Sequence, residues 1–204
     1  GNLDNYWQYT YKKIARANYF LENIDKTPIS AELLARFKAE ARFIRACQYF
    51  YLSQYWGDAP LVTKTLTPNE ANQVSKAKKQ ELVTFVEREL QEAANDLPSY
   101  GKLTAAERGR ASKQAALAFL GRIQLAEKAY ADAIKSYEQI INANENSIDP
   151  NYSGLFNGTN ETSKEIIFAT QYLVDLAGNG MFQHNFPAVA GGWHLHCPLG
   201  SLVE

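Results

Sequence analysis

The chain has 204 residues, of which 46% are hydrophobic and 21% are charged, and its net charge is −1. A chain of this length can bury about 70% of its unfolded surface in one sizeable core. The balanced charge and the lack of a basic patch argue against a nucleic-acid partner, and no apolar run approaches the ~20 residues of a membrane-spanning helix.

Two long helices are predicted at the start of the chain. Apolar residues recur at steps of three and four between Tyr6 and Ile24, which is the pattern of one face of an amphipathic helix. A second helix is expected from about Ala31 to Tyr55, with Ser30 as its N-cap and Gly57 as its left-handed C-terminal cap. Its apolar stripe is broad, which indicates burial between two neighbours rather than against one. Residues 60–63 are predicted to be extended.

Three further helices are predicted after a polar loop from Thr67 to Lys79. The first covers the apolar positions from Leu82 to Leu97, and the other two span 112–127 and 130–143. The short join between the last two requires antiparallel neighbours. Their residues match the tetratricopeptide pattern of helical hairpins at Leu117, Leu120, Gly121, Tyr130, Ala133 and Tyr137. The sequence therefore predicts an all-α fold of tetratricopeptide-like stacked helical hairpins.

The charged residues on these helices are interpreted as structural. Arg42 and Arg45 lie in a largely apolar stretch, and since a buried arginine needs an acidic partner, a carboxylate such as Glu40 or Asp58 is expected to pair with one of them. The carboxylates of the helix after the polar loop, including Glu89, are expected to form a solvated face.

The last third of the chain changes character. A short strand-like run at 166–169 is expected to end near Tyr172, and residues 175–200 form a long Gly-rich loop with interspersed aromatic residues. Loops of this length in compact domains are usually functional or disordered. We therefore assign 1–172 to a helical repeat-type domain and 173–204, an irregular, loop-rich tail, to a Gly-rich loop segment of the same incomplete domain.

Four ordered sequence blocks resemble one protein family. They are "IARANYFLENI" at 14–24, "EARFIRACQYFYLSQYWGDAPLVT" at 40–63, "GRASKQAALAFLGRIQL" at 109–125 and "SKEIIFATQY" at 163–172. Together they resemble the SusD/RagB-like proteins, the surface glycan-binding lipoproteins of Bacteroidetes. Members of that family are about twice as long and begin with a signal peptide and a lipid-bearing cysteine, so the chain resembles a middle section of the family pattern, without the lipid anchor.

The resemblance implies a function in nutrient uptake. It implies binding of an oligosaccharide, a polysaccharide or another nutrient at the surface of the outer membrane, and delivery to a SusC-like TonB-dependent channel protein, with no cofactor and no catalysed reaction. Sugar recognition needs aromatic faces flanked by polar groups. The residues that fit this requirement are Trp193, Trp7, Phe182, Tyr172, His194 and Asn5. Trp7 is in phase with Ile14 and Leu21, so it fits a core position equally well.

Two alternatives come from the same residues. A tetratricopeptide-type protein-interaction scaffold, without carbohydrate binding, would use the helical pairs to hold a peptide or partner. A zinc hydrolase would use the imidazoles and thiol within 194–197, but zinc sites usually have wider ligand spacings and a further ligand elsewhere. We therefore predict no metal.

Overall fold

The computed structural model of the chain describes residues 2–171, with side chains from Asp4 onwards. Residues up to Phe168 form one compact unit, and a second unit begins at Ala169. The predicted boundary between 172 and 173 lies outside the described residues and stays a prediction. The described residues contain α-helices, short 3-10 helices and a single isolated β-bridge between Ala59 and Ala77, so the all-α prediction is confirmed.

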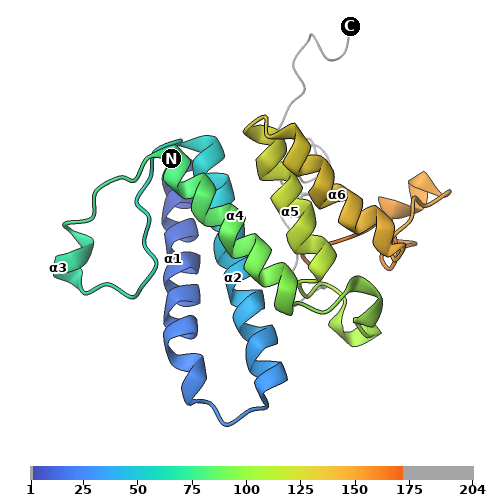
Figure 1. Cartoon of the computed structure of the whole chain (residues 1–204), viewed down its shortest axis with the longest axis horizontal. Helices are drawn as coiled ribbons and strands as arrows, with labels where there is room; N and C mark the ends of the chain where they lie inside the picture. Colours follow the sequence, from blue (N-terminus) through green and yellow to red (C-terminus); the bar gives the residue numbers. More distant parts are fainter. Residues whose placement is uncertain (1, 172–204) are drawn as a thin grey trace, which may run out of the picture. The chain divides into compact units, whose positions relative to one another are not determined.

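The helices occupy nearly the predicted ranges. In chain order they are α1 (Asn2–Asn23), α2 (Ala31–Tyr55), α3 (Pro68–Ala71), α4 (Lys79–Asp96), α5 (Lys113–Ala126) and α6 (Tyr130–Ala143). Short 3-10 helices cover Ile24–Lys26, Tyr100–Lys102, Ala105–Glu107 and Tyr152–Leu155. The helix α1 begins four residues before the predicted start, and α3 lies within the predicted polar loop, which projects away from the long helices (Figure 1).

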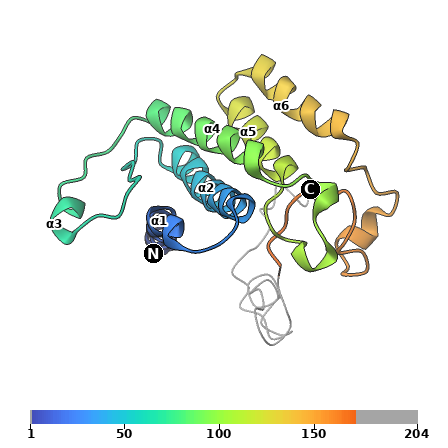
Figure 2. The ribbon, with the colours of Figure 1, turned by 60° about the horizontal axis from the view of Figure 1, so that its bottom comes forward.

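The long helices stack side by side. The pairs α1–α2 and α5–α6 are hairpins, and α4 lies between them, in contact with both α2 and α5 (Figure 2). This arrangement confirms the predicted stack of tetratricopeptide-like hairpins. The run at 166–169, predicted to be strand-like, forms no strand, because the described residues offer it no partner strand.

Local sequence signals fix the ends of α2. The side chain of Ser30 accepts a hydrogen bond from the backbone N–H of Leu33 at 3.3 Å, which satisfies one of the free amides at the start of the helix. Gly57 has a φ of +70°, a conformation that glycine adopts without steric cost, so the chain turns sharply after Trp56. Both predicted caps are confirmed.

The centre of the core is α2, which contacts α1, α4 and α5. Phe43 is 1% exposed, and its ring packs edge-on against Phe119 of α5 with the centroids 5.6 Å apart. Ala46, Tyr49 and Leu52 are completely buried. The broad apolar stripe of this helix is therefore buried between neighbouring helices, as its width predicted.

Side chains, rather than a neighbouring strand, hold the extended segment after α2. The Tyr49 hydroxyl accepts a hydrogen bond from Val62 N–H at 2.7 Å and donates one to Val62 O at 2.8 Å. The Asn18 amide donates to Val62 O at 3.0 Å and to Lys64 O at 3.1 Å, and the Tyr11 hydroxyl donates to Pro60 O at 2.8 Å. These bonds satisfy backbone groups that would otherwise lack partners next to the core.

The partners of the two arginines differ from those predicted. Arg45 pairs with Glu89, which is only 3% exposed, and Arg42 pairs with Glu92. The predicted carboxylates have other partners. Glu40 pairs with both Arg36 and Arg110, and Asp58 pairs with Lys78. The prediction failed because α4 packs against α2 and brings a carboxylate from more than 40 residues away, so Glu89 is a core residue and not part of a solvated face.

Candidate functional site

Two of the six predicted site residues lie within the described part of the chain, and both are on α1. Asn5 is exposed, whereas Trp7 is partly buried. The other four, Tyr172, Phe182, Trp193 and His194, lie outside the described residues, as does Cys197. Residues two positions apart on a helix are about 200° apart around its axis, so Asn5 and Trp7 do not face one ligand together.

Trp7 belongs to an aromatic cluster at one end of the α1–α2 hairpin. Because the two helices are antiparallel, the first turns of α1 lie next to the last turn of α2. The aromatic cluster consists of Tyr6, Trp7, Tyr11, Tyr51, Tyr55 and Trp56. Trp7 packs against Tyr11 with ring centroids 4.9 Å apart and meets Trp56 edge-on at 5.3 Å. Tyr6 stacks on Trp56 at 5.7 Å, and Tyr51 stacks on Tyr55 at 5.9 Å.

The aromatic cluster presents ring surface to solvent. Tyr55 is 63% exposed and Tyr6 is 37% exposed. Burial, with smaller effects from Tyr55 and Tyr51, raises the pKa of Tyr6, so its phenol stays neutral at pH 7. Exposed rings of this kind can stack on the apolar face of a sugar, and their hydroxyls can hydrogen-bond to it.

Sequence reasoning missed Tyr55 as an exposed ring, whereas Tyr6 stands between Asn5 and Trp7, two residues that the sequence did single out. By its spacing Tyr55 continues the apolar stripe of the second helix, which predicts burial, but it is the last residue of α2 and is exposed. The antiparallel hairpin was the available signal, because it predicts that the start of α1 and the end of α2 lie together.

Trp7 also lines a hollow of about 390 Å³ between α1 and the segment that follows α2. Its walls are mainly apolar and include Tyr11, Pro60, Val62 and Leu66. Burial, followed by the proximity of Tyr49, raises the pKa of Tyr11 well above its usual value, and its hydroxyl is occupied by Pro60 O. The ring of Trp7 is thus partly core and partly accessible, which combines the two interpretations that its sequence position left open.

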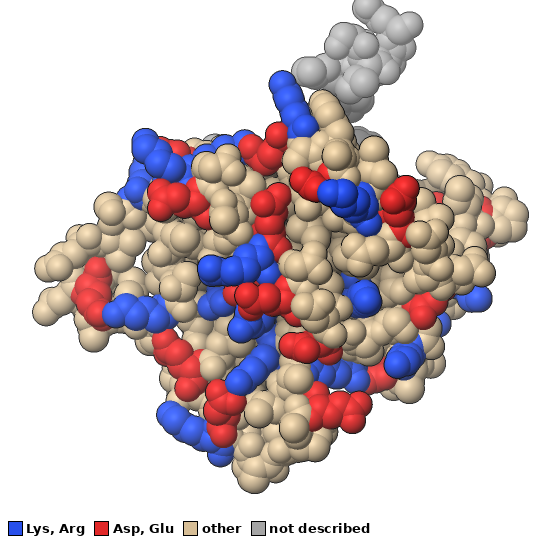
Figure 3. Space-filling view, in the orientation of Figure 1, with Lys and Arg blue, Asp and Glu red and all other residues tan. Residues whose placement is uncertain are grey.

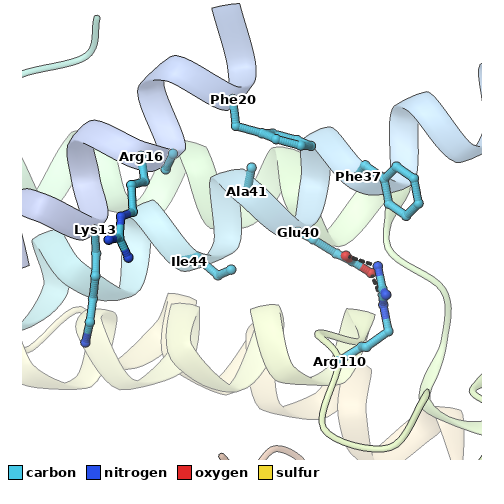
Figure 4. A pocket seen from close by; sticks show the side chains of 9 residues that line it. Lys13, Arg16, Phe20, Phe37, Glu40, Ala41, Ile44 and Arg110 are labelled. Carbon is cyan, nitrogen blue, oxygen red and sulfur yellow. Dashed lines mark hydrogen bonds and ion pairs between the residues drawn. The ribbon is translucent and has the colours of Figure 1, made fainter. Parts of the chain in front are cut away.

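A second concave surface, which we call the α1–α2 groove, lies elsewhere on the same hairpin (Figure 4). It has a volume of about 480 Å³ and is lined by Lys13, Arg16, Ala17, Phe20, Phe37, Glu40, Ala41, Ile44 and Arg110. Arg110, from the loop before α5, donates two hydrogen bonds to the Glu40 carboxylate, at 2.9 and 2.5 Å.

The face in Figure 3 carries interspersed charges of both signs, in line with the absence of a basic patch from the sequence.

The described residues contain no cluster of three or more His, Cys, Asp or Glu side chains placed to hold a metal ion. None of the described helices has the length and hydropathy needed to cross a membrane.

Comparison with known proteins identifies the family. A SusD-like family model, described as "Starch-binding associating with outer membrane", matches residues 1–125. A SusD-like protein of Formosa agariphila is 31% identical over 198 residues, which cover 93% of this chain. The chain belongs to the SusD-like family. It spans 37% of the length of that curated relative.

Solved structures of SusD-like proteins share the fold. A SusD-like carbohydrate binding protein from Bacteroides fragilis superposes with a TM-score of 0.89 at 42% identity, over 95% of this chain and 38% of that one. A laminarin binding SusD-like protein superposes with a TM-score of 0.76 at 29% identity, over 80% of this chain and 36% of that one. The resemblance seen in the sequence is therefore confirmed over nearly the whole chain.

Proposed function

We propose that this SusD-like protein binds a glycan at the surface of the outer membrane and delivers it to a SusC-like TonB-dependent channel. Membership of the SusD-like family carries the proposal, since the family description names starch binding and association with the outer membrane. The laminarin binding relative shows that the shared fold serves a second glucan as well. In this proposal the protein binds and transfers its ligand and catalyses no reaction.

We assign glycan contact to two groups of residues. The first, inferred from the resemblance, is Trp193 with Tyr172, Phe182 and His194. The second is the aromatic cluster: its exposed rings are Tyr6 and Tyr55, which meet edge-on, and Tyr6 lies between Asn5 and Trp7 in the sequence. The exposed rings support this second assignment, because a platform for a sugar needs accessible aromatic faces.

Calorimetric titration with an oligosaccharide panel tests glycan binding. The panel should include laminarin and starch fragments, and the longest natural form of the protein should be used. We expect at least one member to bind and Trp193→Ala to weaken it at least about tenfold, which corresponds to about 1.4 kcal/mol. Tyr152→Ala is the matched control, because Tyr152 is a 73% exposed ring outside both groups. No binding across the panel would contradict the function, and binding unaffected by Trp193→Ala would contradict the assigned site.

Delivery and location need separate tests. We expect the protein to be labelled on intact cells by a reagent that does not cross membranes, and to co-purify with a TonB-dependent channel protein after mild detergent extraction. Labelling only after cell lysis would contradict the surface location. Purification without any channel protein would contradict the delivery step.

A further inference from the structure

The α1–α2 groove has a regular construction that the proposed glycan site does not use. On α1 its lining residues Lys13, Ala17 and Phe20 follow the spacing of one helix face, and on α2 Phe37, Ala41 and Ile44 do the same. Ala17 and Ala41 are the middle members of the two stripes and have small side chains, whereas the residues at the ends are larger. Figure 4 shows Ala41 between Phe37 and Ile44 on α2. The result is a hole between two ridges, about two helical turns or 10 Å long.

Apolar side chains that line the α1–α2 groove are open to solvent. Phe20 is 38% exposed and Ile44 is 48% exposed, although each is large and apolar. Grouped apolar side chains on a concave surface are typical of a binding site, whereas scattered ones need no explanation. A sugar is a poor occupant of this apolar groove, because its hydroxyls would lose their hydrogen bonds to water without replacement.

The rim of the groove carries an excess of positive charge. Its one carboxylate, Glu40, is already neutralised by Arg110 and by Arg36, whose Nε lies 3.2 Å from it. The other two cations on the rim, Lys13 and Arg16, have no ion-pair partner among the residues that the structure describes. Carboxylates of an incoming segment would complement these two cations.

We propose that the α1–α2 groove is a docking site for an acidic amphipathic helix of a partner protein. A helix presents apolar residues at i, i+4 and i+7, the same spacing as the two stripes, so that its ridge fits between α1 and α2. A large apolar side chain occupies the hole over Ala17 and Ala41. Glutamates one turn away reach Lys13 and Arg16. This surface is independent of the glycan site, and the proposal does not rest on the proposed function.

Binding of a designed peptide tests the docking site. The probe is a stapled 14-residue helix with leucines at i, i+4 and i+7 and flanking glutamates, carrying a fluorescent label for anisotropy. We expect Arg16→Glu to weaken binding at least about tenfold, and a peptide with lysines in place of the glutamates to bind that variant better than it binds the wild type. Ile44→Ser should weaken binding as well, and because Ile44 is half exposed the fold should persist, as checked by circular dichroism.

Lys12→Glu is the matched control. Lys12 is exposed on the same helix and its ammonium lies over the Tyr9 ring, so the change alters the net charge equally but outside the groove. Equal losses for Lys12→Glu and Arg16→Glu would overturn the proposal, as would equal binding of the acidic and basic peptides by the wild type. Binding by the 204-residue chain but not by the longest natural form would show that the protein's own polypeptide occupies the groove. Concentration-dependent dimers abolished by Ile44→Ser would show a second copy there, and both results would overturn the partner-protein proposal.

Discussion

Arg45 and Glu89 illustrate how single residues position the segment that follows α2. The guanidinium of Arg45 donates to the Glu89 carboxylate from Nε at 2.9 Å and from Nη2 at 2.5 Å, and to Asn18 Oδ1 at 2.8 Å. Asn18 in turn donates to the backbone of Val62. A buried pair of this kind gives little net stability, but removing one partner leaves a charge uncompensated inside the protein.

Glu89→Ala is therefore expected to lower the free energy of unfolding by about 3–5 kcal/mol. Glu92→Ala is the control: Glu92 also pairs with an arginine, Arg42, but its side chain is 45% exposed, so the loss should stay below about 1 kcal/mol. Urea unfolding followed by circular dichroism measures both changes. Equal losses in the two variants would show that water reaches the Arg45 pair.

Glu107 supplies a pH-dependent contribution to stability. Hydrogen bonds from Thr104, followed by the pairing with Arg36, lower the pKa of this carboxyl from 4.5 to about 2. Because the folded pKa is the lower one, the stabilisation is complete above about pH 4.5 and is lost as the pH falls towards about 2. We expect Glu107→Gln to be less stable than the wild type at pH 6, and the difference to shrink on acidification across that window.

Titration by NMR measures the Glu107 pKa directly. Thr104→Val is the informative companion variant, because it removes the hydroxyl that donates to the carboxylate at 2.9 Å but keeps the backbone donor. The pKa should rise part of the way towards its ordinary value. A wild-type pKa of 4.5 or above would contradict the structural account.

At the scale of helices, the α5–α6 hairpin depends on a close approach at Gly121. A Cβ atom added there would lie 2.6 Å from Cζ of Tyr137, closer than real side chains approach. We expect Gly121→Ala to destabilise the protein by about 1–3 kcal/mol, because the partly buried ring must move. In a Tyr137→Ala background the same change should be neutral or stabilising, since alanine favours a helix by about 1 kcal/mol over glycine. A double-mutant cycle with no coupling between the two positions would disprove the contact.

Helix positions could be predicted from the sequence, whereas their partners could not. The periodicity of α2, its Ser30 cap and Gly57 are local signals, and each was confirmed. The pairing of Arg45 with Glu89 depends on the packing of α2 against α4, which no local pattern records. The α1–α2 groove was missed for the same reason, because Phe20 and Ile44 have the residue types of a core and only the helix arrangement leaves them open.

At the scale of the whole described unit, the contacts between helices are unequal. Helix α2 packs against α1, α4 and α5, whereas α6 makes extensive contact with α5 alone. In stacked repeats each element is stabilised mainly by its neighbours, so a terminal element opens more easily than a central one. Helix α2, which contacts three other helices, should therefore open only when the whole unit unfolds.

Native-state hydrogen exchange tests this order of stability. We expect amides in the middle of α2, around Ala46 and Leu52, to exchange only through global unfolding, because both side chains are completely buried at the junction of the helices. Amides in the middle of α6, around Ser136, should exchange faster, through opening of that helix alone. Glu89→Ala should speed exchange in α2 by a factor that corresponds to the whole decrease in the free energy of global unfolding. The rate at which α6 opens should not change, because Glu89 lies on α4, which α6 does not contact extensively. Equal protection in α2 and α6 would instead mean that the hairpins open only together, as one cooperative core.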